Sequence, residues 1–533
     1  MAYGYDETES EATVGSKSAK LASFILVGKI LSFLLAGASF VIVARILGAS
    51  TYGLYTLAVA VSGFFGSVGN FGIGSAINRF LSKRRGKKGF AKSAGRIVSD
   101  SMAGLLVLTA ILFAVTIALS GTIASYFFHN AALTGLIDIA ALTIVTLVVF
   151  DASYYALVGA GLGSKVSESV AAMAFFQAFV SIALALDGVG AASPIIGLVV
   201  GNLAGTSAAM YFLYRAGIRL VRPSAEGMRR IYRFAFPIGV SNIFGLVVSN
   251  LGLIILGIVS TSVVIGNFGV ASRVGYLIDI VTGSMSISIL SLFSSALGRR
   301  MRRSAINRFY NYATYYALLA VAPVVVTVVA LAKPFSYTVF GSGYSIAPLF
   351  IALLGLGSII SIIGGYIGLL FIAAGKVKKF LKYAFLIFVL EFIFVVPLVS
   401  FEKGFGLALG LFIASPIIAD AVLIFAGKRV FGVRTDFGRL ARVGVANVAS
   451  IVVPVLIEAF SGFNYIVVLL LSILCVIIVY PAALYAAGAA RSNDISLVSE
   501  ATSQIPLVGR FIKLIERYFI AIQGAFGGSN GKR

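Results

Sequence analysis

Long apolar runs separated by short polar and basic segments fill the chain from about residue 20 to residue 488. The runs are at least about 20 residues long and lack strand-like alternation, and a helix of that length crosses a bilayer. Helices also satisfy their own backbone in lipid. The predicted spans are 20–44, 52–80, 98–120, 134–158, 167–187, 193–214, 234–259, 264–297, 310–332, 347–375, 379–400, 404–427, 441–460 and 464–488. The pattern predicts an all-α integral membrane protein with about fourteen transmembrane helices.

Lysine and arginine are distributed unevenly between the connections of these spans. Connections that follow even-numbered spans, counted with the first residues of the next span, hold 28 of them, whereas those that follow odd-numbered spans hold three, namely Arg45, Lys333 and Lys403. Positively charged residues accumulate on the cytoplasmic side of membrane proteins. The asymmetry therefore predicts that both termini are cytoplasmic. A missed or added span would disrupt the alternation, which supports the count of fourteen.

Composition excludes several classes of protein. Of the 533 residues 59% are hydrophobic and 11% charged, too few charges for a soluble surface. The net charge of +23 is concentrated in the short connections, which lack the aromatic platforms of nucleic-acid-binding proteins. His129 and Cys475, each the only residue of its type, cannot form an ordinary His/Cys metal site, and no G-x-x-x-x-G-K-[ST] motif occurs. We therefore expect no nucleic-acid partner, metal, cofactor or enzymatic site.

An internal repeat divides the predicted spans. Tyr52–Ala58 matches Ile265–Ala271 at an offset of 213, and the same offset relates Lys20 to Arg233. Six spans followed by six in the same orientation predict two parallel lobes, and repeats of this kind in transporters place the substrate path at their interface. The predicted domains are a disordered cytoplasmic tail (1–18), an N-lobe (19–215), a basic cytoplasmic linker (216–233), a C-lobe (234–428), spans 13 and 14 (439–488) and a cytoplasmic tail (489–533).

Both ends of the chain carry further expectations. The acidic, polar start predicts a short tail without a cleavable signal peptide before the first span. Residues 505–524 combine apolar residues with four charges, which predicts either an interfacial amphipathic helix or a helix packed on the bundle.

Short motifs of glycine, arginine and aromatic residues mark the openings of both predicted lobes. They are Ala44–Gly48, Tyr52–Tyr55, Phe71–Gly74 and Asn78–Arg79 in the first lobe, and Phe234–Gly239 and Gly266–Arg273 in the second. Together with the span layout, they resemble polysaccharide-biosynthesis flippases of the multidrug/oligosaccharidyl-lipid/polysaccharide exporter superfamily. The resemblance implies a transporter of the cell membrane that moves a polyprenyl phosphate- or diphosphate-linked oligosaccharide to the outer leaflet. It also implies two lobes that rock around a basic cavity, with membrane lipids and the glycosyltransferases or polymerase of the same pathway as candidate partners.

Charged side chains within spans are candidates for the transport path, because burying a charge in lipid is costly. Lys29 in span 1 and Arg273 in span 8 are interpreted as cavity residues. Asp279, in the middle of span 8, is a further candidate. Arg45 and Arg79 lie at opposite ends of spans 1 and 2, where interface anchoring is the main interpretation and phosphate contact the alternative.

Uncharged and acidic residues supply the remaining candidates. Asn242 and Asn250 on span 7 could bind sugar hydroxyls, although interhelical hydrogen bonds are the commoner use. Coupling to protons or Na⁺ requires carboxylates, so Glu391, Asp151 and Asp420 are ion-coupling candidates. For Asp151 and Asp420, pairing with a neighbouring span is the competing interpretation. The sequence identifies no ion.

Two other functions stay open beside the flippase. A cation-coupled multidrug exporter of the same superfamily usually has twelve spans and an acidic cavity, whereas fourteen spans with Lys29 and Arg273 favour the flippase. A membrane-embedded glycosyltransferase or polymerase would be supported by large outward loops, and the predicted loops here are short.

Overall fold

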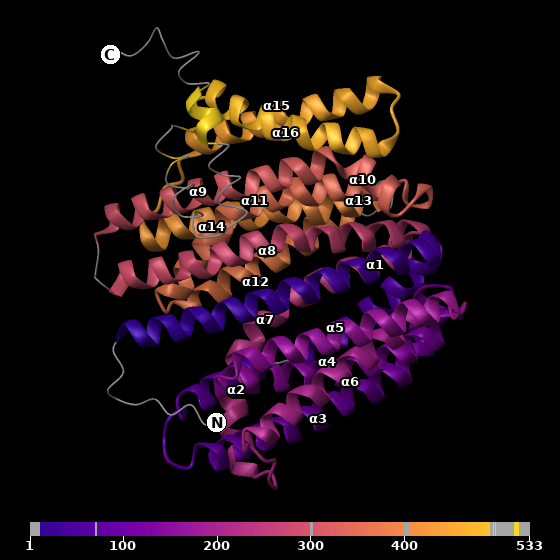
Figure 1. The fold of residues 1–533 in the computed structure, drawn as a ribbon, viewed down its shortest axis with the longest axis vertical. Coiled ribbons are helices and arrows are strands. Elements are labelled where there is room, and N and C mark those ends of the chain that lie inside the picture. Colours follow the sequence, from indigo (N-terminus) through magenta and orange to yellow (C-terminus); the bar gives the residue numbers. More distant parts are fainter. Residues whose placement is uncertain are drawn as a thin grey trace. The chain divides into compact units, whose positions relative to one another are not determined.

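The computed structural model describes residues 11–69, 72–298, 302–398, 404–490, 494, 496 and 516–521. Within these ranges the side chains of residues 11–34, of a number of residues between 237 and 298 and of a few other single residues lie outside the described set. All regular structure in the described ranges is helical, which confirms the predicted fold class (Figure 1). The chain divides into two compact units, and the boundary falls between Gly266 and Asn267.

The first unit contains seven complete helices within its described residues, and α8 begins at its end. They are α1 (Glu11–Gly69), α2 (Ile73–Ser82), α3 (Phe90–Thr122), α4 (Leu133–Ala160), α5 (Gly163–Leu186), α6 (Ala192–Arg215) and α7 (Ala225–Val259). A π-helical turn, η1 (Ile123–Phe127), extends α3, and α8 (Ser262–Gly298) continues into the second unit. Helices α5 and α6 run side by side (Figure 1).

The second unit continues the series with long helices and short connecting turns. They are α9 (Arg303–Ala330), α10 (Ala332–Val339), the 3₁₀ turn η2 (Ser342–Tyr344), α11 (Ala347–Ala373), α12 (Val377–Leu398), α13 (Gly404–Leu409), the π-helical η3 (Gly410–Ala414), α14 (Ser415–Phe431), α15 (Phe437–Ser461) and α16 (Tyr465–Ala486). Helices α15 and α16 form an adjacent pair (Figure 1).

Each predicted span overlaps one of these helices. Among the described residues, eleven helices are long and apolar enough to cross a membrane. The predicted count is larger by three because α1 bends at Gly48 and so carries two predicted spans, and because α7 and α8 fall outside the eleven. Gly48 has φ 69° and ψ 167°, a left-handed corner that a residue without a Cβ adopts readily. The count of fourteen and the cytoplasmic termini stay predictions.

The corner after Gly48 packs against the start of α8 in a reciprocal contact. A Cβ on Gly53 would lie 2.7 Å from the carbonyl carbon of Ser262 and closer still to its oxygen. A Cβ on Gly266 would lie 2.9 Å from the carbonyl carbon of Ala49 and closer still to its oxygen. Gly53 and Gly266 differ by 213, the offset of the predicted repeat, and so do Ala49 and Ser262. Each glycine therefore contacts the residue that the predicted repeat pairs with the glycine's own neighbour four positions back.

The described part of the chain after α16 packs on the second unit. The carboxylate of Asp494 accepts hydrogen bonds from the hydroxyls of Tyr315 and Tyr316 on α9. Residues 516–521 are helical, and Phe519 is fully buried with its ring 6.1 Å from that of Tyr485. For these six residues the geometry favours packing on the bundle over an interfacial position. The rest of the predicted amphipathic helix, 505–515 and 522–524, lies outside the described residues.

Candidate anion-binding site

Helix α2 presents one apolar and one basic face. Ile73, Ile77 and Leu81 follow one another at four-residue intervals and are buried, whereas Arg79 and Lys83 are exposed. A Cβ on Gly74 would overlap the ring of Tyr155 on α4, so the glycine lets these two helices approach closely. This packing fixes the direction in which the basic face of α2 points.

Partly buried hydrogen bonds hold the segment before α7 on α3. Asp100, which is 2% exposed, accepts the backbone N–H of Ser224 at 2.6 Å, and the Ser99 hydroxyl accepts the N–H of Val221 at 2.8 Å. The Ser224 hydroxyl in turn accepts the N–H of Gly227 and so caps the helix. Helix α7 therefore begins at Ala225, inside the predicted linker, and its first turns are held beside α3.

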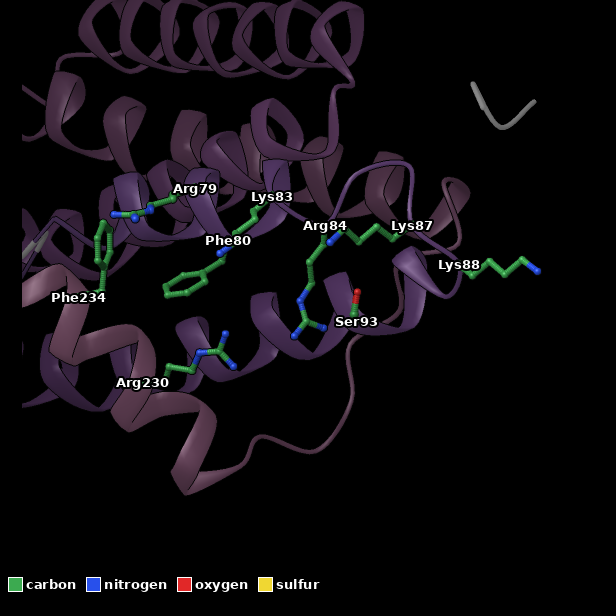
Figure 2. Close-up of a pocket in the computed structure, with 9 residues that line it drawn as sticks. All are labelled: Arg79, Phe80, Lys83, Arg84, Lys87, Lys88, Ser93, Arg230 and Phe234. Atoms are coloured by element: carbon green, nitrogen blue, oxygen red, sulfur yellow. The ribbon is translucent and has the colours of Figure 1, made fainter. Parts of the chain in front are cut away.

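A cavity of about 540 Å³ opens between the ends of α2, α3 and α7 in the first unit (Figure 2). Six of its nine lining residues are cations and none is acidic; the lining residues are Arg79, Phe80, Lys83, Arg84, Lys87, Lys88, Ser93, Arg230 and Phe234. None of the six cations forms an ion pair with another described residue. The cavity therefore concentrates positive charge that no carboxylate of its lining neutralises.

Two arginines of this basic pocket are stacked on two phenylalanines in a reciprocal arrangement (Figure 2). The guanidinium of Arg79 on α2 lies 4.3 Å from the ring centre of Phe234 on α7. The guanidinium of Arg230 on α7 lies 5.4 Å from the ring centre of Phe80 on α2. The two rings pack edge to face at 5.6 Å, so each helix contributes one arginine and one aromatic ring.

Stacking leaves these guanidinium groups suited to binding an anion. A guanidinium is attracted to a ring by its face, while its N–H donors point outward in its plane. Planar donor pairs match the oxygens of phosphates and carboxylates, and charge-assisted hydrogen bonds of this type are the stronger ones. The composition of the basic pocket therefore suits an anion of the size of a phosphate.

The other predicted basic residues with described side chains, Arg45 and Arg273, are not among the lining residues of this pocket. Arg45 is exposed near the Gly48 corner of α1, and Arg273 is exposed on the part of α8 that belongs to the second unit. The side chains of four further candidates lie outside the described residues; these are Lys29, Asn242, Asn250 and Asp279. Of the predicted substrate-binding residues, only Arg79 lines the described cavity.

The carboxylate candidates lie in separate places. Asp151 is half-buried on α4 in the first unit. In the second unit, Glu391 on α12 accepts a hydrogen bond of 2.5 Å from the hydroxyl of Ser415. Asp420 on α14 is 6% exposed and accepts the backbone N–H of Gly364 on α11 at 2.8 Å. No group of three or more metal-ligating side chains forms among the residues that the structure describes.

Sequence reasoning missed several residues of the basic pocket. Arg230, Lys83 and Arg84 entered only as charges that set topology, and Phe80 was not singled out. One signal was present: Phe80 directly follows the Asn78–Arg79 motif, and Phe234 opens the second-lobe motif. A phenylalanine beside an arginine at the end of each of two spans could have suggested a stacked pair.

Comparison with protein families decides the relationship of the chain. A family model described as polysaccharide biosynthesis protein matches residues 18–294, just over half of the 533 residues. The chain belongs to this family. The matched region includes α2, α3 and α7 and hence the whole basic pocket. The family resemblance of the sequence motifs is thereby confirmed.

Solved structures with the same fold are membrane transporters. The lipid II flippase MurJ in an inward closed conformation matches with a TM-score of 0.67 and 17% identity, over 86% of this chain and 97% of that chain. An inward-facing multidrug resistance MATE family transporter of the MOP superfamily matches with a TM-score of 0.60 and 16% identity, over 76% of this chain and 98% of that chain. A MOP superfamily transporter from Pyrococcus furiosus matches with a TM-score of 0.53 and 14% identity, over 77% of this chain and 94% of that chain. The search of curated proteins gives no match.

These findings establish the class of the protein. At such identities the structural matches show a shared fold, the all-helical fold of MOP superfamily transporters. With eleven candidate spans among the described residues, the protein is a multi-pass membrane protein of transporter fold. Its structural relatives are transporters and a flippase, in agreement with the expectation of a non-enzyme.

Proposed function

We propose that the protein flips a polyprenyl phosphate- or diphosphate-linked oligosaccharide across the cell membrane by alternating access, for surface polysaccharide or glycan biosynthesis. The observation that carries this proposal is the basic pocket, in which six cations and no carboxylate surround a cavity of about 540 Å³. It lies at the ends of α2 and α7 that the charge distribution predicts to be cytoplasmic. A lipid-linked sugar assembled in the cytoplasm presents its phosphate at this level of the membrane.

The chemistry of flipping explains the need for cations. A phosphate must be kept out of the hydrocarbon, while the polyprenyl tail can remain in the bilayer. Arginine and lysine meet that need at successive depths: the basic pocket at the surface, and Lys29 and Arg273 further along the predicted spans. Asn242 and Asn250 supply hydrogen-bonding groups for sugar hydroxyls. No covalent bond is made or broken in this function.

The runner-up function is cation-coupled multidrug export, and one of the structural relatives is named as a multidrug resistance transporter. A cationic drug would be repelled by a pocket that holds six positive side chains and no negative one. A lipid phosphate is attracted by the same charges. The pocket therefore favours the flippase over the exporter.

Asp420 is the ion-coupling candidate with the best-defined geometry. One oxygen of its carboxylate accepts the N–H of Gly364, and the other is buried with no hydrogen-bond partner among the described residues. A Cβ on Gly364 would overlap the carboxylate, so the glycine keeps α11 close to this group. A proton or a cation at the second oxygen would compensate the buried charge, which makes Asp420 suited to coupling.

Asp420→Asn tests this coupling role. The amide keeps an acceptor for the Gly364 N–H, so we expect the variant to fold and to reach the membrane in normal amount. Flipping by protein reconstituted in vesicles should no longer respond to an imposed proton or sodium gradient. Glu391→Gln, which can keep its hydrogen bond to Ser415, is the matched comparison. An unchanged response of Asp420→Asn to both gradients would exclude Asp420 as the coupling group.

Lipid analysis of cells that lack the protein tests the main proposal. We expect a lipid-linked oligosaccharide to accumulate and to remain facing the cytoplasm, where a membrane-impermeant reagent added outside cannot reach it. Surface glycan should fall at the same time, and plasmid-borne protein should restore both. Loss of synthesis of the lipid-linked sugar would instead indicate an enzyme. Unchanged sugar lipids with increased sensitivity to cationic drugs would indicate the exporter.

A further inference from the structure

Two kinds of cation lie in and around the basic pocket, and the difference between them goes beyond topology. Orientation in the membrane requires only that positive residues lie in the cytoplasmic connection, wherever their side chains point. Arg229, the neighbour of Arg230, is such a residue, since it is exposed and lies outside the lining of the cavity. Arg79 and Arg230 instead line one cavity, and the guanidinium of each lies over a ring of the other helix. Topology does not explain this reciprocal placement.

The stacked pair is preorganised. An arginine side chain loses about 2 kcal/mol of conformational entropy when it is fixed by a ligand, and a ring that already holds it reduces this cost. Phe234 holds Arg79 and Phe80 holds Arg230, while the two rings hold each other. Since the rings belong to α7 and α2, neither helix alone supplies a complete binding group.

We propose that this pocket binds the diphosphate group of the lipid-linked substrate at the cytoplasmic membrane surface, before the substrate enters the membrane-embedded path. The two arginines, together with Lys83, Arg84 and Lys87 of the lining, supply enough positive charge and enough N–H donors for both phosphates of a diphosphate. The volume of about 540 Å³ is within the range of small-molecule sites and leaves room for the sugar beside the diphosphate. The assignment of the diphosphate to a sugar lipid rests on the proposed function, whereas binding of the anion does not.

The fastening of α7 supports a binding role for this end of the helix. Asp100, Ser99 and Ser224 hold the segment before α7 on α3, and the hydroxyl of Tyr232 donates to the carbonyl of Ser101 at 3.2 Å. These contacts keep Arg230 and Phe234 next to α2 without using any cation of the pocket. Fixed scaffolding of this kind lets a site keep its geometry when the ligand is absent.

Calorimetric titration of the full-length protein in detergent with inorganic pyrophosphate tests the proposal. We expect saturable binding that weakens as salt is raised, because screening shortens the reach of the pocket charges. Arg79→Ala and Arg230→Ala should each weaken binding by about tenfold or more, the usual effect of losing one charge-assisted interaction. Arg229→Ala, which removes the same charge from the neighbouring residue outside the lining, should leave the affinity unchanged within about twofold. An equal loss of pyrophosphate affinity in all three variants would overturn the proposal, because it would show that the anion is attracted by the positive surface in general and not bound in the pocket.

A fluorescence reporter places the ligand within the pocket. The chain contains no tryptophan, so Phe234→Trp introduces a single indole in the position of the ring beneath Arg79. Pyrophosphate should change its emission, and Arg79→Ala should abolish that change. The control is Phe437→Trp, an exposed position at the start of α15, whose emission should not respond. A response from Phe437→Trp alone would contradict the assignment.

Competing probes distinguish the source of the anion. Farnesyl diphosphate should displace pyrophosphate at lower concentration than inorganic phosphate does, because it keeps both phosphate groups. Nanodiscs of phosphatidylglycerol should compete weakly; competition equal to that of farnesyl diphosphate would show a general lipid-headgroup site and overturn the diphosphate assignment. If pyrophosphate fails to bind while cells lacking the protein accumulate lipid-linked sugar, this inference fails and the proposed function stands. If pyrophosphate binds but no sugar lipid accumulates, the proposed function fails and the pocket still stands as a diphosphate-binding site.

Discussion

Gly266→Ala is expected to destabilise the protein and to abolish most of its transport. The added methyl would lie 2.9 Å from the carbonyl carbon of Ala49, closer still to its oxygen, and 3.1 Å from the backbone nitrogen of Gly53. All three neighbours are backbone atoms, which cannot turn aside as a side chain can. Overpacking in a tight contact costs about 1–3 kcal/mol. A shift of that size changes the balance between two conformations by about fivefold to more than a hundredfold.

Thermal unfolding of the purified protein and surface glycan display in cells check this expectation together. Gly37→Ala on α1 is the matched control, because a Cβ there meets nothing within 4 Å and alanine favours a helix over glycine. Gly53→Ala should resemble Gly266→Ala, since its Cβ would meet the carbonyl of Ser262. The double variant with both glycines replaced should lose less free energy of unfolding than the two single variants lose together. The first added methyl already separates the Gly48 corner from the start of α8. A Gly266→Ala protein with normal unfolding and normal display would contradict the close contact.

The sequence was sufficient to predict the helices, whereas the internal repeat stays a prediction. Apolar run length and alternating charge are properties of single segments, so they can be read without knowing how segments pack. The offset of 213 then paired Gly53 with Gly266. It did not show that the two glycines meet the backbone of each other's repeat, because that contact depends on the corner at Gly48 and the start of α8.

The basic pocket could be predicted only in part. Arg79 was interpreted chiefly as an interface anchor, with phosphate contact as the alternative, and Arg230 as one of many topological charges. Their convergence depends on Asp100, which binds Ser224 across 124 residues of sequence. Such a contact leaves no periodic signal in the chain. Besides the phenylalanines next to arginines, an acidic residue within the first turns of a predicted span was a local indication.

The carboxylates illustrate the same limit. Their positions within predicted spans are visible in the sequence, but the groups that compensate them are not. Asp420 is held by the backbone N–H of Gly364, and backbone donors carry no side-chain signature. Glu391 is held by the hydroxyl of Ser415, one of many serines in the spans. Pairing with a neighbouring helix is therefore evident only once the helices are packed.

Arg273→Ala is expected to abolish export of the surface glycan while the amount of protein in the membrane stays normal. Arg273 lies eleven residues from the start of α8, which is about 16 Å along the helix axis and so about half the thickness of the hydrocarbon core. Its side chain is exposed, so truncation leaves no hole in a packed core. A guanidinium at that depth is costly unless a protein group, water or an anionic substrate compensates its charge, and the proposed function assigns it to the substrate. Removing it should therefore affect transport and not folding.

Quantifying surface glycan and membrane protein in the same cells tests this prediction. Arg273→Lys keeps the charge but loses the planar pair of donors, so partial export is expected. Ser272→Ala is the neighbouring control, because its hydroxyl bonds only to the carbonyl of Phe268 on the same helix and carries no charge. Normal display in Arg273→Ala would remove Arg273 from the transport path and leave the basic pocket as the anion-binding site of the protein. Loss of display in Ser272→Ala as well would indicate that α8 tolerates no change at this level, and the charge would not be the cause.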